Sequence, residues 1–196
     1  MDISASAIIC AVRNHGETGA IVRAFTADHG MLAGYVAGAR GRQLRPVLIP
    51  GNVIKGEWRT RITGQLARLT PEPLHSRAHL LGEPLAIAAI DWVTALTAAT
   101  LAEGVPYPRV YSACDGLLSA IELAPAARVW AGAIAQYETL LLAELGYAED
   151  YDADSAPVAM MAQNRKRLVA HVLGDRRADV MAARERLVDR LKRAVA

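Results

Sequence analysis

Three arginines within six residues are the most concentrated chemical feature of this sequence. Arg40, Arg42 and Arg45 follow two alternating apolar stretches, and because no acidic residue stands between them the segment carries a charge of +3. Gly38 and Gly41 in the same segment allow another backbone to approach closely. Such a segment favours a phosphate chain as its ligand, and the alternative is an ordinary solvated turn.

Further basic residues in the same N-terminal region strengthen the phosphate hypothesis. A basic groove beside a small barrel is how such folds follow a nucleic-acid backbone. Arg68 belongs to this basic set. The residues that we predict to contact DNA are Arg40, Arg42, Arg45, Arg59, Arg61, Arg23 and Lys55.

Aromatic rings on which bases would stack are scarce in this region. Phe25, Tyr35 and Trp58 are the only ones. Phe25 and Tyr35 fit a place in the core as well as they fit a stacking platform, so base stacking is the weak side of the nucleic-acid hypothesis.

Enzymatic and metal chemistry have no local motif in the sequence. No Gly-x-Ser-x-Gly is present, and no Walker or Rossmann glycine pattern precedes a helix. His75 and His79 are four apart, which on a helix places both rings on one face, but surface or capping roles suit them better than a metal. Cys10 and Cys114 are single and far apart, as packed thiols in a reducing compartment are. We therefore predict no catalytic residue, no metal and no cofactor.

The elements that must position the arginines are short strands separated by glycines. Alternating or apolar patterns predict strands over 3–13, 21–26, 31–37, 46–55, 57–63 and 65–70, with a bulge or bend at Pro50 and Gly51. No long helix interrupts them. This pattern indicates a small closed barrel, for which the oligonucleotide-binding (OB) fold is the leading candidate.

Helical periodicity begins after Pro71-Glu72-Pro73, the sharpest change of composition in the chain. It predicts helices from Ser76 onward with a new start at Pro84, over 109–123 and over 126–145, where Gly146 is placed as a C-terminal cap. A short segment over 159–173 and an amphipathic helix over 176–195 follow a polar linker. The predicted fold class is α+β, with an OB-fold barrel at 1–72, an α-helical domain at 73–150, and a linker with a basic helical tail at 151–196.

Charge is segregated along the chain, although the formal net charge is only +2. Residues 1–71 carry a net +5, residues 72–162 a net −9, and residues 163–196 a net +6. The two basic ends favour an anionic ligand and the acidic middle a different task. Two points stay open at this stage. The basic tail helix either binds DNA or folds onto the acidic part, and the apolar helices either form a core or leave a groove for a partner peptide, with Arg128 available for its carboxylate.

Nothing in the sequence predicts a membrane protein. The longest apolar span, Leu85 to Ala102, carries Asp91 at its centre, which favours a buried helix over a membrane helix. The apolar run at the N-terminus has no basic segment before it, so we expect no secretory signal and a cytoplasmic location.

Several short motifs together resemble the RecO family of recombination mediators. They are Gly16-Glu17-Thr18, Phe25 to Gly30, Gly38-Ala39-Arg40, Leu48 with Pro50-Gly51-Asn52, and Glu144-Leu145-Gly146-Tyr147. The resemblance covers about the first 150 residues. It implies an OB-fold and a helical domain that bind single- and double-stranded DNA, anneal complementary strands, associate with the nucleoid and work with RecR to load RecA on DNA coated by single-stranded-DNA-binding protein (SSB). It also implies that the helical domain binds the acidic C-terminal tail of SSB.

The chain departs from this family pattern in two places. Many relatives carry a four-cysteine zinc module after the position of Gly146, whereas this chain has two cysteines in all. Where some relatives supply an arginine for the SSB tail, Gln136 and Tyr137 stand near the position and Arg128 lies two turns earlier, so Arg128 is the predicted partner-binding residue. The leading hypothesis is a non-enzymatic DNA-binding mediator, and the alternative is a protein-interaction scaffold with incidental DNA affinity.

Overall fold

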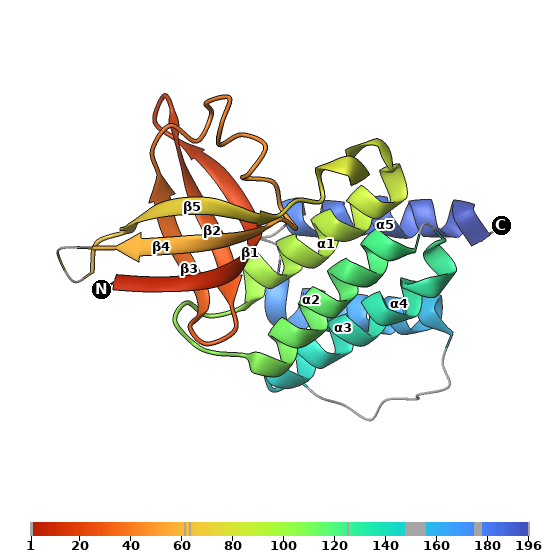
Figure 1. Cartoon of the computed structure of the whole chain (residues 1–196). Coiled ribbons are helices and arrows are strands. Elements are labelled where there is room, and N and C mark those ends of the chain that lie inside the picture. The colour runs from red at the N-terminus through yellow and green to blue at the C-terminus, as the bar shows by residue number, and fades with distance from the viewer. Residues whose placement is uncertain are drawn as a thin grey trace. The chain divides into compact units, whose positions relative to one another are not determined.

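The described residues form two compact units. The computed structural model describes residues 2–60, 62, 64–124, 126–147, 156–174 and 178–195. One unit spans Met1–Gly82 and Leu101–Pro108, and the other spans Glu83–Thr100 and Arg109–Ala196. Strands belong to the first unit and long helices to the second (Figure 1).

Five strands close into a barrel in the order β1-β2-β3-β5-β4, with β4 returning to β1. They are β1 (Asp2–His15), β2 (Gly19–Thr26), β3 (Gly30–Val36), β4 (Val53–Arg59) and β5 (Ala67–His75). The 14-residue β1 pairs with β4 from Asp2 to Ile8 and with β2 from Ala7 to His15, with a register shift in the β2 pairing between Ile9 and Ala11. Such a shift bends a strand, which allows one strand to serve both sides of the closure. The barrel followed by helices confirms the predicted α+β class with an N-terminal OB-fold.

Trp58 fills the centre of the barrel. Its side chain is fully buried among small and branched residues from the other strands. A Cβ atom added to Gly56 would lie 2.3 Å from the Trp58 ring, and one added to Gly34 would lie 3.0 Å from it. These two glycines are therefore strand residues that make room for the indole, and they do not end strands.

The sequence-based strand bounds were wrong between residues 46 and 60, and Arg61 and Thr63 of the second predicted strand lie outside the described residues. The predicted strand over 46–55 and the next one from 57 are replaced by a single strand, β4, which runs through Gly56. Residues 46–51 form turns and a bend instead of a strand, and the Leu48 side chain among them is buried in the barrel core. The predicted bend is present, and Gly51 adopts a φ of +89° there.

β5 runs beyond its predicted end at residue 70, through Pro71 and Pro73, to His75. It pairs with β3 only at Ala67 and Arg68, so past that point one of its edges has no strand partner among the described residues. A proline lacks a backbone N–H, and an unpaired edge is where that loss is tolerated.

Residues 101–108 return to the barrel after the first long helix, and we call them the strap. Gly104 N donates to the Met31 carbonyl over 3.0 Å, and a bridge pairs Met31 with Glu103. Arg23 on β2 holds the same segment through an ion pair with Glu103 at 3.1 Å and a hydrogen bond to the Leu101 carbonyl. The strap thus covers part of the β3 edge that β5 leaves open.

Three of the helices among the described residues begin at prolines, and α3 is followed by the glycine cap that the sequence predicts. They are the 3-10 helix Ala78–Gly82, α1 (Pro84–Thr100), α2 (Pro108–Leu123), the short helix η2 (Ala127–Val129), α3 (Ala131–Glu144), α4 (Pro157–Arg167) with a π-helical extension Leu168–Leu173, and α5 (Ala178–Val195). Proline suits a first helical turn because its missing N–H is not needed there. Gly146 has a φ of +87°, and hydrogen bonds from Gly146 N to Ala143 O and from Tyr147 N to Leu142 O confirm the predicted cap.

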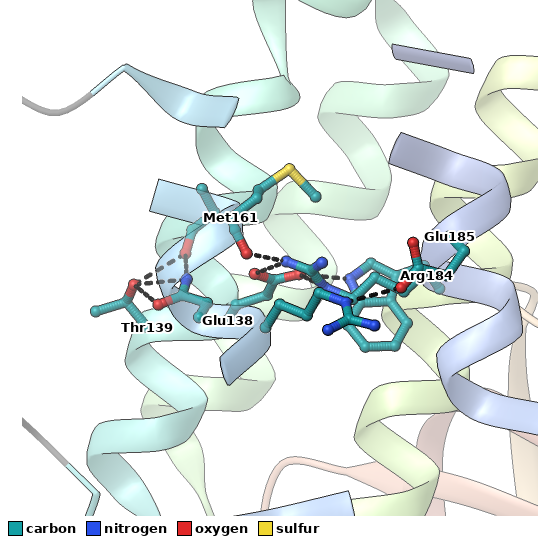
Figure 2. Close-up of polar contacts among 9 residues, drawn as sticks. Glu138, Thr139, Met161, Arg184 and Glu185 are labelled. Atoms are coloured by element: carbon teal, nitrogen blue, oxygen red, sulfur yellow. Dashed lines mark hydrogen bonds and ion pairs between the residues drawn. The ribbon is translucent and has the colours of Figure 1, made fainter. Parts of the chain in front are cut away.

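A buried ion pair joins the helices of the second unit (Figure 2). Glu138 on α3 accepts two hydrogen bonds from Arg184 on α5, at 2.9 and 3.0 Å, and one from Trp92 Nε1 on α1 at 2.9 Å. Arg184 also donates to the Met161 carbonyl on α4 and lies over the Trp92 ring. Burial raises the pKa of the Glu138 carboxyl, and the charge and hydrogen bonds of Arg184 oppose that rise. Removing one partner of such a pair costs about 3–5 kcal/mol, because the other charge stays buried.

Of the two roles that the sequence left open for the basic tail, folding onto the helical part is the one that the structure shows. Val180, Ala183, Leu187 and Leu191 on α5 are buried, as the apolar stripe predicted. A second ion pair, from Arg165 to Glu185 at 2.8 Å, joins α4 to α5 on the surface. The tail helix is therefore packed into the helical unit.

Two smaller expectations also have outcomes. Cys10 and Cys114 are free and buried, as predicted for packed thiols. Among the described residues no helix combines the length and the apolar character that a membrane span requires, and α1, with Asp91 in it, belongs to the helical unit.

A glycine pair tests the contact between the strap and the barrel. Gly30 and Gly16 have the same backbone conformation, with φ of +66° and +67°, but a Cβ on Gly30 would lie 1.9 Å from the Val105 carbonyl oxygen and one on Gly16 would meet nothing within 4 Å. Gly16→Ala should lower the free energy of unfolding by about 1 kcal/mol through backbone strain alone. Gly30→Ala should cost about 1–3 kcal/mol more, because the strap must move. Chemical denaturation measures both, and equal losses would contradict the contact.

Candidate nucleic-acid interface

The arginine segment is a folded loop between β3 and β4. Gly38 has a φ of +64°, and successive turns are closed by hydrogen bonds from Gly41 N to Gly38 O, Arg45 N to Gly41 O and Leu48 N to Leu44 O, each between 2.9 and 3.0 Å. Ala39 and Leu48 are buried in the barrel core. The loop is thus anchored at two points by apolar side chains, Leu44 and Val47 pack partly against the same core, and the arginines between the anchors are exposed.

Asn52 holds the end of this loop with nearly every hydrogen-bonding atom it has. Its side-chain amide donates to the carbonyls of Pro46 and Val47, both at 3.1 Å, and its side-chain oxygen accepts from Arg77 N at 2.8 Å. The Asn52 carbonyl accepts from Ile9 N at 2.9 Å. Asn52 is 2% exposed, so these bonds are shielded from water and each unmade one would carry its full desolvation cost.

Arg77 completes the anchor from the far end of β5. Its side chain is buried, and it donates to the Gly51 carbonyl, while Gly51 N donates to the Ile9 carbonyl at 2.8 Å. An arginine that could have been counted with the surface charges is therefore part of the support of the loop. Sequence reasoning did not single out Arg77 or the side chain of Asn52, because their partners are backbone atoms about 25 residues apart in the chain.

Two of the three loop arginines line a cavity of about 390 Å³. Arg40 and Arg45 line it together with Asn14, and its apolar part comes from Val12, Ala20, Ala39 and Leu48. Arg40 is fixed at the rim, because its side chain donates to the Glu17 carbonyl at 3.0 Å and its backbone N–H donates to the Thr18 carbonyl at 3.2 Å. Within the described part of the chain the guanidinium groups of Arg42 and Arg45 make no hydrogen bond or ion pair.

The other predicted DNA contacts do not gather at this cavity. Arg59 forms a surface ion pair with Glu57 at 3.0 Å, and both line a second cavity of about 760 Å³ beside Asp2 and Arg68. Lys55 is exposed on β4. Arg23 is bound to the strap, and Arg61 lies outside the described residues. The structure thus brings Arg40 and Arg45 together and sets Arg59 in a separate place.

The helical unit carries its own groove between α2 and α3. The groove has a volume of about 360 Å³ and is lined by Ala113, Gly116, Leu117, Ala120, Ala133, Gln136, Tyr137 and Leu140. Most of these side chains are small or apolar, so the groove can admit an apolar peptide side chain. Arg128 is exposed in η2 and is not one of the lining residues.

No arrangement of side chains in the described part of the chain nominates a metal site. His75 ends β5 and His79 lies in the 3-10 helix, so the two do not share a helix face. Groups of three or more histidine, cysteine or acidic side chains close enough to hold a metal ion do not occur among the described residues.

The fold and the similarity to known proteins together identify the family of this chain. A closed barrel of OB order, with a cationic loop and a separate helical unit, defines the class of the protein as an OB-fold protein with a helical C-terminal part. The family model "Recombination protein O N terminal" matches residues 1–77, and "Recombination protein O C terminal" matches residues 81–194. The chain belongs to the RecO family.

Curated relatives have the same family name. The DNA repair protein RecO of Ruegeria sp. (strain TM1040) is 38% identical over 157 residues, which cover 80% of this chain and 64% of the relative. That of Gluconacetobacter diazotrophicus is 35% identical over 156 residues, covering 78% and 61%. That of Caulobacter vibrioides (strain NA1000 / CB15N) is 34% identical over 151 residues, covering 76% and 61%. The chain thus spans somewhat less than two thirds of the length of these relatives.

Removing the Asn52 anchor tests whether the loop is held in place. Asn52→Ala should lower the free energy of unfolding by about 1–3 kcal/mol, because it leaves buried carbonyls and the Arg77 N–H without partners. It should also speed amide hydrogen exchange across residues 38–52. Gln43→Ala, at an exposed position of the same loop, should change stability by less than about 0.5 kcal/mol. Unchanged exchange in the loop of the Asn52 variant would show that the loop is held by other contacts.

Proposed function

We propose that this protein is a non-enzymatic recombination mediator of DNA repair. It binds single- and double-stranded DNA, anneals complementary strands and, together with RecR, assists the loading of RecA on DNA coated with SSB. The family and the names of the relatives support this role. The observation that carries it is the anchored loop, which presents Arg40 and Arg45 at one cavity and the exposed Arg42 between them in sequence.

The chemistry of the loop suits a phosphate chain. A guanidinium group is planar, permanently charged and offers two parallel N–H groups to phosphate oxygens. Arg42 and Arg45 are exposed, so a phosphate would not have to displace an existing ion pair, whereas at Arg59 it would compete with Glu57. Arg59, Arg61 and Lys55 therefore extend the proposed contact surface, and the loop is its centre. Arg23, which is paired with Glu103, contributes through the electrostatic field of the barrel.

In the helical unit we assign the α2–α3 groove to the acidic C-terminal tail of SSB. The lining of small and apolar residues suits the apolar end of such a tail, and Arg128 supplies a charge for its carboxylates in the same unit. The scaffold alternative shares this groove but predicts no strand annealing by the purified chain.

The DNA site is tested by salt dependence. Replacing Arg40, Arg42 and Arg45 by Ala should flatten the slope of log affinity against log salt by about 2, because each phosphate contact on single-stranded DNA contributes about 0.7. It should also slow the annealing of SSB-coated complementary oligonucleotides. The matched variant replaces Arg190, Lys192 and Arg193, three exposed cations on α5, by Ala and should leave the slope unchanged. Equal flattening in both variants would mean that total charge, and not the loop, sets the affinity.

The groove is tested by filling it. Gly116 is exposed on α2 and a Cβ there meets nothing within 4 Å, so Gly116→Leu should leave the fold intact while it occupies the groove. Binding of a labelled peptide from the cognate SSB tail, measured by fluorescence anisotropy, should weaken about tenfold or more. Gln163→Leu adds the same side chain at an exposed α4 position outside the groove lining and should have no effect. A Gly116 variant with full affinity would remove the groove from the proposal.

A further inference from the structure

The phenylalanine, tyrosine and tryptophan rings of the barrel unit are buried or half-buried. Besides imidazoles, the unit has four aromatic side chains, those of Phe25, Tyr35, Trp58 and Tyr107. Phe25 and Trp58 are 0% exposed, and Tyr107 is half-buried. Two of the three rings in the barrel strands are thus part of the core and present no face to a nucleobase.

Tyr35 is the aromatic ring left to consider in the strands, and its surroundings already cover it. A Cβ added to Gly19 would lie 2.4 Å from the Tyr35 hydroxyl, so the ring lies directly on the backbone of β2. His15 meets it edge-on, with ring centroids 6.0 Å apart and planes at 81°. The half-buried Tyr35 is therefore packed between β2 and His15, and this packing takes the place that a stacked base would need.

The cavity of the loop offers charge without a stacking surface. Its apolar part is made of aliphatic side chains, and its polar part is made of the guanidinium groups of Arg40 and Arg45 and the amide of Asn14. The loop around it is held by the Asn52 hydrogen bonds and by the contact of Arg40 with the Glu17 carbonyl. Cations presented on an ordered loop bind a phosphodiester and do not read the identity of the base.

The inference that follows from these observations extends the proposed function, and it rests on the proposed binding of DNA. We infer that the barrel holds single-stranded DNA through its phosphodiester backbone alone, and that the bases stay unstacked on the protein with their pairing edges free. OB-fold proteins that stack bases on aromatic rings occupy the faces of those bases and gain affinity from them. A backbone-only site gains nothing from the base, and a strand held in this way is available for pairing with its complement.

Binding of DNA without bases tests this mode directly. The probes are a labelled oligothymidine and a strand of equal length in which every nucleoside is a tetrahydrofuran abasic analogue, each titrated with the full chain at the same salt concentration. We expect dissociation constants within about threefold of one another and equal salt slopes, because each stacked base would contribute roughly 5- to 150-fold. The Arg40/Arg42/Arg45→Ala variant should weaken both probes by the same factor.

His15 provides the control for an exposed ring at the end of β1. Its neighbour Asn14 lines the cavity, and because side chains alternate along a strand the imidazole lies on the opposite face, where it is exposed beside Tyr35 and open to a base. His15→Ala should leave the affinity for oligothymidine within about twofold of the parent value, since a single stacked base contributes at least roughly fivefold. A loss confined to the probe with bases would reveal stacking on His15 and overturn the inference.

The outcomes separate the inference from the proposed function. Tight oligothymidine binding with abasic binding weaker by about tenfold or more would overturn backbone-only recognition and leave the DNA-binding role standing. Abasic binding that survives in the triple-arginine variant would overturn the assignment of this mode to the loop. No binding of either probe would overturn both, because the proposed function requires DNA binding.

Discussion

The carboxylate of Glu138 is the constraint on which the helical unit depends. A charge with no access to water needs a counter-charge and hydrogen bonds to every lone pair that faces the protein. Arg184 provides both, and it comes from the last helix among the described residues, while Trp92 from the first long helix provides a further donor. The helical unit can satisfy this carboxylate only when α1, α3 and α5 are all in place, so α5 is a required member of the unit. The positive charge of the tail, which the sequence displays as a block, is thus partly used inside the protein.

The barrel meets the opposite requirement, since its charges must stay outside and in fixed positions. A flexible arginine loop would lose conformational freedom whenever it bound an anion, and that loss would reduce the affinity. Here the loop is ordered in advance by buried Ala39 and Leu48 and by the Asn52 and Arg77 hydrogen bonds. The same core that supports the loop also takes up the indole of Trp58, and the ring of Phe25 is fully buried as well. A ring that is buried stabilises the barrel but cannot contact a ligand, and in this chain Trp58 and Phe25 are both buried.

The features that the sequence predicted correctly are those that depend on residues close together in the chain. Alternation found β1 to β3, the apolar stripe found α5, and a glycine after an apolar helix found the cap at Gly146. The run from Val47 to Ile49 was wrongly assigned to a strand, because an apolar segment that plugs a barrel has the same composition as one that pairs within it. Arg23 and Arg77 bind carbonyls or a carboxylate that are distant in sequence, and Asn52 accepts a hydrogen bond from the equally distant Arg77 N–H. No pattern of residue types reveals such partners. The arginine loop could be identified from the local composition of the sequence, whereas the residues that anchor it could be identified only from the three-dimensional structure.

The strap gives the barrel an order of assembly. Residues 101–108 pair with the edge of β3 but are synthesised after α1, so the barrel is discontinuous in the gene while it is continuous in space. During translation the first five strands emerge with part of the β3 edge still uncovered, and an uncovered edge is a template for pairing with other chains. This part of the β3 edge can be covered only after α1 and the strap have left the ribosome. The point in the sequence that looks like the end of the barrel is therefore not the point at which the barrel becomes safe from aggregation.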